Sequence, residues 1–163
     1  MNKQAFNPYL PSWEYIPDGE PYVFDGRLYV YGSHDNFNGY VFCMNDYVCW
    51  SAPVDDLSDW RYEGVIFKKT DDPLNPDGHM CLYAPDVTRG QDGKYYLYYV
   101  LDKVSVVSVA VCDTLAGKYE FYGYVRKRQI ESRLYRGGRE AYTLLVGLCT
   151  DATLFDAYQK KIF

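Results

Sequence analysis

Short runs of aromatic and β-branched residues, separated by turn-forming pairs, dominate the first 125 residues of the chain. The clearest runs are YVFDGRLYVYGS, YVFCMNDYVCW, KYYLYYVLD and VSVVSVAVCD, at residues 22–33, 40–50, 94–102 and 104–113. Asp-Gly, Gly-Ser and Asn-Gly pairs mark turns within and between them. No helical periodicity is sustained over three turns before residue 126. The pattern predicts an all-β architecture.

The chain also repeats itself at a spacing of about 67 residues. The first copy holds Pro17-Asp18, Asp25-Gly26, Tyr29, Tyr31 and Asp35, and the second holds Pro85-Asp86, Asp92-Gly93, Tyr96, Tyr98 and Asp102. Between them, DLSDWRYEGVIF at residues 56–67 is typical of outer strands that close one unit. A four-stranded repeat of this length is closest to a β-propeller blade. Because the innermost strands of successive blades line one axis, we expect Asp18 and Asp86 to face a shared pocket.

Composition narrows the class of protein further. The 163 residues are 48% apolar and 24% charged, as in one globular domain with a substantial core. The start of the chain lacks the apolar run of a signal peptide, and no stretch reaches the roughly 18 apolar residues of a spanning helix. We therefore expect a cytoplasmic protein with no membrane contact. A net charge of −5 argues against a nucleic-acid partner, which needs a basic face.

Cysteine usage agrees with a reducing compartment. The five cysteines form no C-x-x-C pair, and their odd number does not suit a disulfide framework. We expect reduced, mostly buried thiols rather than disulfides or zinc ligands at Cys43, Cys49, Cys81, Cys112 and Cys149.

Charge changes abruptly near Arg126. Residues 1–125 carry a net charge of −9, whereas residues 126–163 carry +4 and lose the tyrosine-rich strand pattern. We therefore divide the chain into a propeller part, 1–125, and a divergent basic tail, 126–163. Two explanations of the tail stay open: a rearranged or out-of-frame end, which we favour, and a native segment that caps the exposed blade.

The matched aspartates fit a known chemistry. Inverting glycoside hydrolysis uses one carboxylate as a base on water and a second, protonated one as the acid, about 6.5–9.5 Å apart. A third carboxylate can raise the pKa of the acid by like-charge repulsion. Taken singly, Asp18 could form only an Asx turn before Gly19, and Asp86 could cap a strand entry. Hairpin turns account fully for Asp25 and Asp92.

Two segments resemble glycoside hydrolase family 43, whose members are five-bladed β-propellers. PDGEPYVFDGRLYVYGSHD, residues 17–35, is similar to the opening motif of that family, and LYAPDVTRGQDGKYYLYYV, residues 82–100, to its Trp-Ala-Pro-Asp-Val stretch. DLSDWRYEGVIF is a weaker match to a blade end. The resemblance implies that Asp18 is the catalytic base and that Asp86 modulates the pKa of the acid. Glu20 competes with Asp18 for the role of base, and Tyr83 replaces the usual tryptophan.

This resemblance covers residues 7–125 and implies an inverting, exo-acting glycosidase on arabinose- or xylose-containing chains. The general acid of the family is a glutamate on a later blade, and neither Glu131 nor Glu140 has its sequence context. We therefore assign no acid, and we expect that this chain alone could be inactive. Five blades of this pitch need on the order of 300 residues, so two to two and a half blades are expected here. Unclosed sheet edges of that kind could promote self-association.

Further side chains beside the motifs are candidates for substrate binding: Trp13, Glu20, His34, Phe37 and Tyr83. His34 and His79 could approach a cation such as calcium at the propeller axis, but two isolated histidines predict no metal site, and no cofactor is expected. Two other functions stay open. One is a carbohydrate-binding propeller remnant without catalysis. The other is a phosphorolytic five-bladed relative, ranked last because no basic cluster accompanies the motifs.

Overall fold

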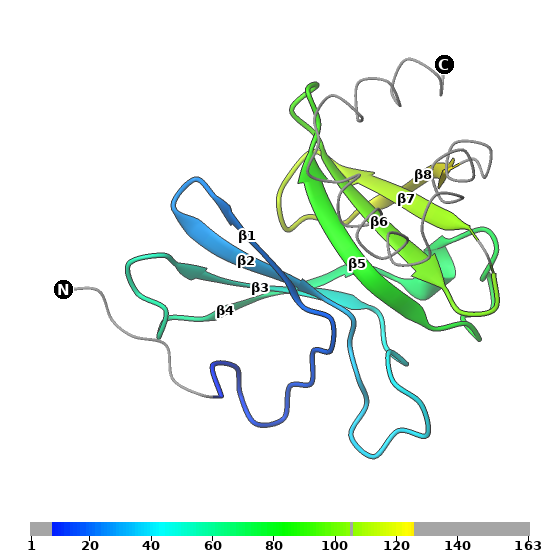
Figure 1. The fold of residues 1–163 in the computed structure, drawn as a ribbon, viewed down its shortest axis with the longest axis horizontal. Coiled ribbons are helices and arrows are strands. Elements are labelled where there is room, and N and C mark those ends of the chain that lie inside the picture. The colour runs from blue at the N-terminus through cyan, green and yellow to red at the C-terminus, as the bar shows by residue number, and fades with distance from the viewer. Residues whose placement is uncertain (1–7, 105, 126–163) are drawn as a thin grey trace, which may run out of the picture.

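The computed structural model describes residues 8–104 and 106–125, which form eight strands and one short 3₁₀ helix. Figure 1 shows the strands arranged as two sheets side by side. The predicted tail, 126–163, lies outside the described residues. The elements are β1 (Glu20–Phe24), β2 (Arg27–Gly32), β3 (Tyr47–Pro53), β4 (Arg61–Phe67), η1 (Lys69–Asp71), β5 (Leu82–Arg89), β6 (Tyr95–Leu101), β7 (Val107–Cys112) and β8 (Glu120–Val125).

Each sheet is an antiparallel meander of four strands, in the orders β1-β2-β3-β4 and β5-β6-β7-β8. The repeat seen in the sequence is thus confirmed as two successive blade-like units. β4 closes the first unit, as the segment 56–67 predicted. The first hairpin has a two-residue turn in which Asp25 and Gly26 have φ values of 48° and 77°. Both central residues of a type I′ turn need positive φ, which explains this Asp-Gly pair.

One expected strand is shorter than the sequence pattern indicated. The run at 40–50 pairs with its neighbours only from Tyr47 onward, and residues 40–46 belong to a loop. Cys43 in this loop has a φ of 61°, in the left-handed region that does not continue a strand. The apolar run YVFC therefore belongs to a loop with aromatic side chains rather than to a longer β3.

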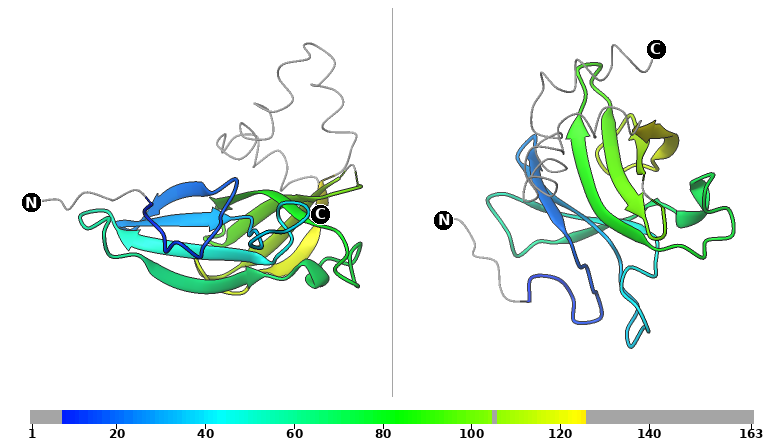
Figure 2. Two further views of the ribbon diagram at one scale, coloured as in Figure 1. Left: turned by 90° about the horizontal axis from the view of Figure 1, so that it is seen from below. Right: turned by 45° about the vertical axis from the view of Figure 1, so that its right-hand side comes forward.

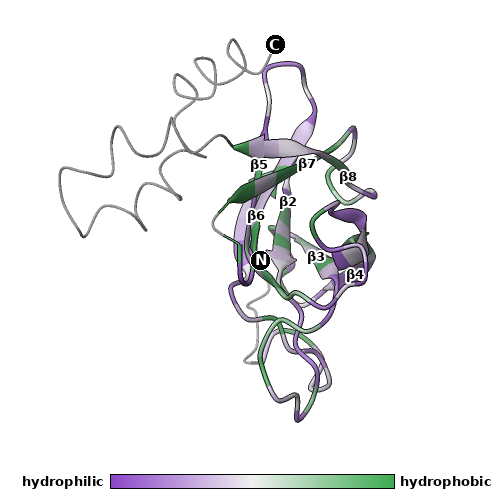
Figure 3. Cartoon of the chain, turned by 90° about the vertical axis from the view of Figure 1, so that its right-hand side faces the viewer, coloured by the Kyte–Doolittle hydropathy of each residue, from purple (hydrophilic) through white to green (hydrophobic). Residues whose placement is uncertain are grey.

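One hydrophobic core joins the two sheets. Figure 3 shows strands in which green, hydrophobic stretches alternate with pale ones, and many of the buried residues are tyrosines. Buried tyrosines need partners for their hydroxyls: Tyr31 donates to the carbonyl of Leu115 at 3.0 Å and Tyr47 to that of Tyr83 at 2.9 Å. The buried members of this core are Tyr29, Tyr31, Tyr47, Cys49, Ile66, Phe67, Met80, Leu82, Val87, Tyr95, Leu97, Tyr99, Leu101, Ala110 and Tyr119.

A buried carboxylate ties the connection between the sheets to the second sheet. Asp72 follows η1 and is fully buried. It accepts hydrogen bonds from the hydroxyls of Tyr99 on β6 at 2.7 Å and Tyr124 on β8 at 3.0 Å, and from the amide of Leu74 at 2.8 Å. Burial and the bonded Asp72 carboxylate raise the pKa of Tyr124 to about 12. This network fixes the path of the chain from the first sheet to the second.

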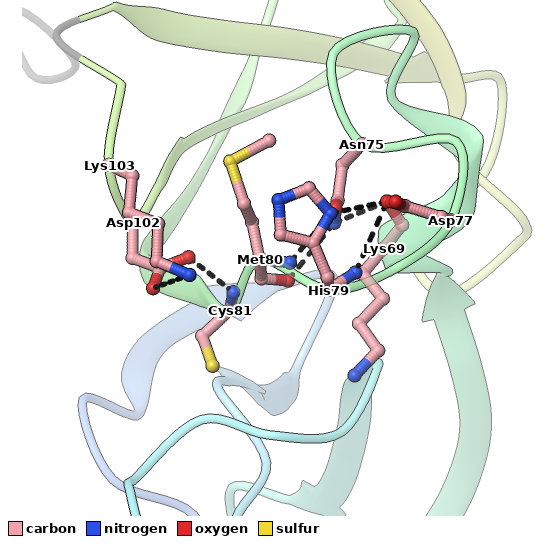
Figure 4. Close-up of polar contacts among 8 residues, drawn as sticks. All are labelled: Lys69, Asn75, Asp77, His79, Met80, Cys81, Asp102 and Lys103. Carbon is pink, nitrogen blue, oxygen red and sulfur yellow. Dashed lines mark hydrogen bonds and ion pairs between the residues drawn. The ribbon is translucent and has the colours of Figure 1, made fainter.

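The next residues of that connection form a second polar cluster (Figure 4). The buried Asn75 side chain donates to the carbonyls of Lys69 and Met80, both at 3.0 Å, and accepts from the Met80 amide at 2.9 Å. Just before β5, the amide of Cys81 donates to Asp102 at 2.7 Å. These contacts fix the position of the start of β5, which begins four residues before Asp86.

Several predictions can be compared with this fold. The four described cysteines are free thiols, and Cys43, Cys49 and Cys81 are buried as expected, while Cys112 is partly exposed. Within residues 8–104 and 106–125 no helix is long and apolar enough to cross a bilayer. Self-association through sheet edges stays a prediction.

Candidate carboxylate site between the two sheets

The innermost strands of the two sheets, β1 and β5, meet through a direct side-chain contact. The hydroxyl of Tyr22 on β1 donates to Oδ1 of Asp86 on β5 at 2.7 Å. Figures 1 and 2 show β1 and β2 running beside β5, so that residues about 64 positions apart in the chain come together. The second candidate aspartate therefore lies at the junction of the two blades.

A backbone irregularity places Asp86 at this junction. The ladder between β5 and β6 is interrupted between Tyr83 and Asp86, and Ala84 has a φ of 48°. Such a bulge locally increases the twist of a strand and re-aims the side chains that follow. Oδ2 of Asp86 is buried and has no hydrogen-bond partner among the described residues. This oxygen is free to receive a donor from a ligand or from another part of the protein.

Asp18 has a different local structure. It lies in a turn two residues before β1, is exposed, and has a φ of 52°. Aspartate tolerates this left-handed conformation better than most residues. Charges act between Asp18 and two neighbours, since Asp18 contributes to the raised pKa values of both Glu20 and Cys43. The charge of Asp18, which lies in the turn before β1, thus acts on the region around Glu20.

Strand register makes Glu20, rather than Asp18, the counterpart of Asp86. Glu20 pairs with Tyr31 across the first hairpin, and Asp86 pairs with Tyr98 across the second. Tyr31 and Tyr98 are equivalent in the sequence repeat, so their partners are equivalent too. The sequence repeat had matched Asp18 with Asp86 because each follows a proline.

Glu20 faces the junction between the sheets. Glu20 and Tyr22 lie two residues apart, on the half-buried face of β1, whereas Pro21 and Val23 are exposed. Burial, followed by the negative charges of Asp86 and Asp18, raises the pKa of Glu20 above its usual value of 4.5. The structure therefore brings three carboxylates together, two of them on β1 and the turn before it and one on β5.

The segment before Asp18 is anchored by a residue that sequence reasoning missed. The side chain of Glu14 is only 1% exposed and pairs with Nε2 of His34 at 2.7 Å. The same carboxylate accepts a hydrogen bond from the indole of Trp50 at 2.9 Å. His34 was a candidate for substrate binding; in this structure its ring is paired with Glu14. The one signal in the sequence was that Glu14 is a charged residue between two aromatic residues, Trp13 and Tyr15.

The aromatic candidates come from three different segments of the chain. Trp13 is 65% exposed and its ring is 6.1 Å from that of Trp50. Phe37 is 78% exposed on the loop after β2. Tyr83 is on β5, where its ring lies 5.5 Å from Phe42. Sequence reasoning did not single out Tyr22, although its position two residues after Glu20 places it on the same face of the strand.

His79 lies away from these groups. Its ring contacts Asp77 in the exposed part of the loop before β5 (Figure 4). Among residues 8–104 and 106–125, no three His, Cys, Asp or Glu side chains are grouped so that they could hold a metal ion.

Comparison with known proteins gives this site a family context. A xylosidase/arabinosidase of Thermoclostridium stercorarium is 85% identical over 126 residues, which are 77% of this chain and 27% of that enzyme. A xylosidase/arabinosidase of Bacteroides ovatus is 35% identical over 123 residues, 68% of this chain and 36% of that relative. No protein-family model matches the sequence.

Solved structures agree with the sequence relatives. A β-xylosidase named RS223 is 28% identical and superposes with a TM-score of 0.56 over 67% of this chain and 36% of that structure. A family 43 β-1,3-galactosidase solved with galactodeoxynojirimycin gives a TM-score of 0.59 at 24% identity, over 68% of this chain and 34% of that structure. The latter likeness concerns the fold alone.

The two sheets are thus part of a β-propeller. Together with the sequence relatives, they identify a xylosidase/arabinosidase-like fragment of the glycoside hydrolase family 43 type. The chain spans about a quarter to a third of the length of the curated relatives it matches.

Proposed function

We propose that this protein acts as a glycosidase on xylose- or arabinose-containing chains, with its carboxylates at the junction of the two sheets. The observation that carries the proposal is the Tyr22–Asp86 hydrogen bond of 2.7 Å, which joins the innermost strands of two blades at a carboxylate. Relatives named xylosidase/arabinosidase supply the substrate class. A neutral sugar also suits an acidic chain, because it needs no basic face.

In this proposal Asp18 is the base that activates water. Its exposure gives water access, and its turn sets it apart from the ladder hydrogen bonds of β1. An inverting mechanism requires space for a water molecule between the base and the sugar, and an exposed carboxylate at the rim provides it. The anchoring of the preceding segment by Glu14 supports a fixed position for this carboxylate.

Asp86 acts in this proposal as the carboxylate that tunes and orients the acid. Tyr22 holds Oδ1, and the buried Oδ2 remains available to a protonated partner. A fixed negative charge beside an acid favours the protonated form of that acid. No acid is assigned, since neither Glu131 nor Glu140 has the sequence context of the acid of the family.

Glu20 is the alternative base. Its raised pKa shows that the charged form is disfavoured by burial and by the two aspartates. A raised pKa also suits a general base, whose ideal pKa lies near the operating pH, so this shift does not exclude Glu20 from the role. The spacing of Asp18 to Gly26 and Tyr29, which fits the opening motif of the family directly, favours Asp18 for the base and leaves Glu20 as its alternative.

The direct test is hydrolysis of aryl α-L-arabinofuranoside and aryl β-D-xyloside by the purified protein, followed by proton NMR of the first product formed. The proposal predicts release of the sugar with inverted anomeric configuration. Retention of configuration would contradict the mechanism. Binding of xylose or arabinose oligosaccharides without any turnover would contradict catalysis and favour the carbohydrate-binding function instead.

A further inference from the structure

The loop between β2 and β3 presents an unusual set of exposed aromatic side chains. Phe37 is 78% exposed, Tyr40 90% and Phe42 59%. In Figure 1 this loop extends beyond the ends of the strands, on the side where the segment before β1 also lies. A contiguous patch of exposed apolar side chains often marks a site that binds a protein or a ligand.

These side chains border a groove. It has a volume of about 430 Å³ and is lined by Tyr15 and by residues 35–42. The rings of Tyr15 and Phe37 lie 6.0 Å apart at the groove. Asn36 and Asn38 belong to the same lining as the aromatic residues. Small-molecule sites commonly combine a few such polar groups with aromatic walls in a volume of this order.

Local contacts hold the groove in shape. The amide of Asp35 donates to the carbonyl of Tyr15 at 2.9 Å, which joins the loop to the segment before β1. The Asp35 carboxylate accepts from the amide of Cys43, and the side chain of Asn45 donates to the carbonyl of Asp35 at 2.9 Å. Asp35, the single charged residue of the lining, is therefore engaged inside the loop.

Residues that line the groove contact both segments that carry the candidate aspartates. On one side, Tyr15 stands three residues before Asp18. On the other side, the ring of Phe42 lies 5.5 Å from that of Tyr83, which precedes Asp86 by three residues on β5. The base of the loop is close enough to Asp18 that this charge, after burial and Asp35, helps to raise the pKa of the Cys43 thiol to about 11.

We propose that this groove is a distal sugar subsite, in which Phe37 and Tyr40 stack on a second or third sugar ring of a neutral glycan chain whose terminal sugar lies at the carboxylates. The inference rests on the function proposed above. Flat aromatic faces match the apolar faces of sugar rings, and the two asparagines offer donors and acceptors to sugar hydroxyls. A groove whose single carboxylate is already bonded within the loop suits a neutral ligand better than an ionic one.

The test is isothermal titration calorimetry of the purified protein with xylose and with xylotriose. The wild-type protein is expected to bind the trisaccharide about tenfold more tightly than the monosaccharide. The double variant Phe37→Ala/Tyr40→Ala should lose this advantage, because one aromatic contact contributes a few-fold to about tenfold in affinity. Its affinity for xylose should stay unchanged. Tyr122→Ala removes a half-exposed ring from β8 on the second sheet and serves as the matched control.

The outcomes separate the subsite from the proposed hydrolysis. Wild-type trisaccharide affinity in the double variant would overturn the subsite, and so would an equal loss of xylose affinity. A dimer that forms in the wild-type protein and is lost in the double variant would overturn it in favour of a second copy of the chain. Ring-dependent binding of xylotriose without turnover would support the subsite and contradict the catalytic proposal alone.

Discussion

Glu20 and Asp86 occupy equivalent register positions in successive sheets, opposite Tyr31 and Tyr98, and their negative charges act on each other. Equivalent positions of neighbouring blades converge toward a common axis, so a carboxylate on both innermost strands concentrates charge there. Asp18 adds a third negative charge from the turn before β1. Concentrated charge of this kind costs stability and is a common feature of catalytic sites.

Replacing Glu20 should reveal that cost. The pKa of Glu20 is raised in the folded protein by burial, Asp86 and Asp18, so the folded state binds this proton more tightly than the unfolded state does. Its contribution to stability is present below the unfolded pKa and is lost as the pH rises through the folded pKa. Glu20→Gln cannot ionise, and its melting temperature should therefore exceed that of the wild type at about pH 7.

The same comparison at about pH 3.5 supplies the control, since both proteins then carry a neutral side chain at position 20. The difference in melting temperature should shrink toward zero there. A difference in melting temperature that is the same at both pH values would mean that ionisation of Glu20 does not destabilise the folded state.

Tyr22→Phe should uncouple the two strands at the site. Loss of its hydroxyl removes the 2.7 Å bond to the half-buried Asp86, and the loss of one partner of such a bond costs about 1–3 kcal/mol. Urea unfolding measures this change. Tyr96→Phe removes a hydroxyl bonded to the exposed Asp92 at 2.8 Å and should cost less. Equal losses in both variants would show that the Tyr22–Asp86 bond has no special role.

Asp72→Ala should destabilise the protein more than any exposed change nearby. It removes the acceptor of the buried Tyr99 hydroxyl, the half-buried Tyr124 hydroxyl and the Leu74 amide, and hydrogen bonds to a charged group are worth about 1.5–3 kcal/mol each. We expect a loss of about 3 kcal/mol or more in the free energy of unfolding. Asp71→Ala, at the exposed neighbouring position, should change it by less than about 1 kcal/mol. Similar values for the two variants would contradict the structural role of Asp72.

Sequence reasoning anticipated the features that depend on local patterns. The hairpin at Asp25-Gly26 follows from the positive φ values that its turn requires, and the two four-stranded units follow from the tyrosine-rich repeat. Resemblance to a known family pointed to Asp18 and Asp86, whose roles remain proposals. The turn, the repeat and the motifs can each be recognised from residues that are close together in the sequence.

Other features depend on pairing between distant segments. The bond from Tyr22 to Asp86 joins residues 64 positions apart, and Glu14 meets Trp50 across 36 positions. The different turn lengths of the two hairpins shift the register, so Glu20 takes the place that the repeat gave to Asp18. A shift of this kind becomes visible only when strand partners are known.

Comparing Asp18→Asn with Asp25→Asn in the hydrolysis of aryl arabinofuranoside and aryl xyloside tests the claim that Asp18 is the catalytic base. Both aspartates precede a glycine and have positive φ, and asparagine is tolerated in that conformation. Of the two, only Asp18 acts on a carboxylate of the junction, since it helps to raise the pKa of Glu20. We predict that Asp18→Asn lowers kcat about 100-fold or more, while Asp25→Asn leaves it near the wild-type value. An unchanged rate in Asp18→Asn would contradict the claim.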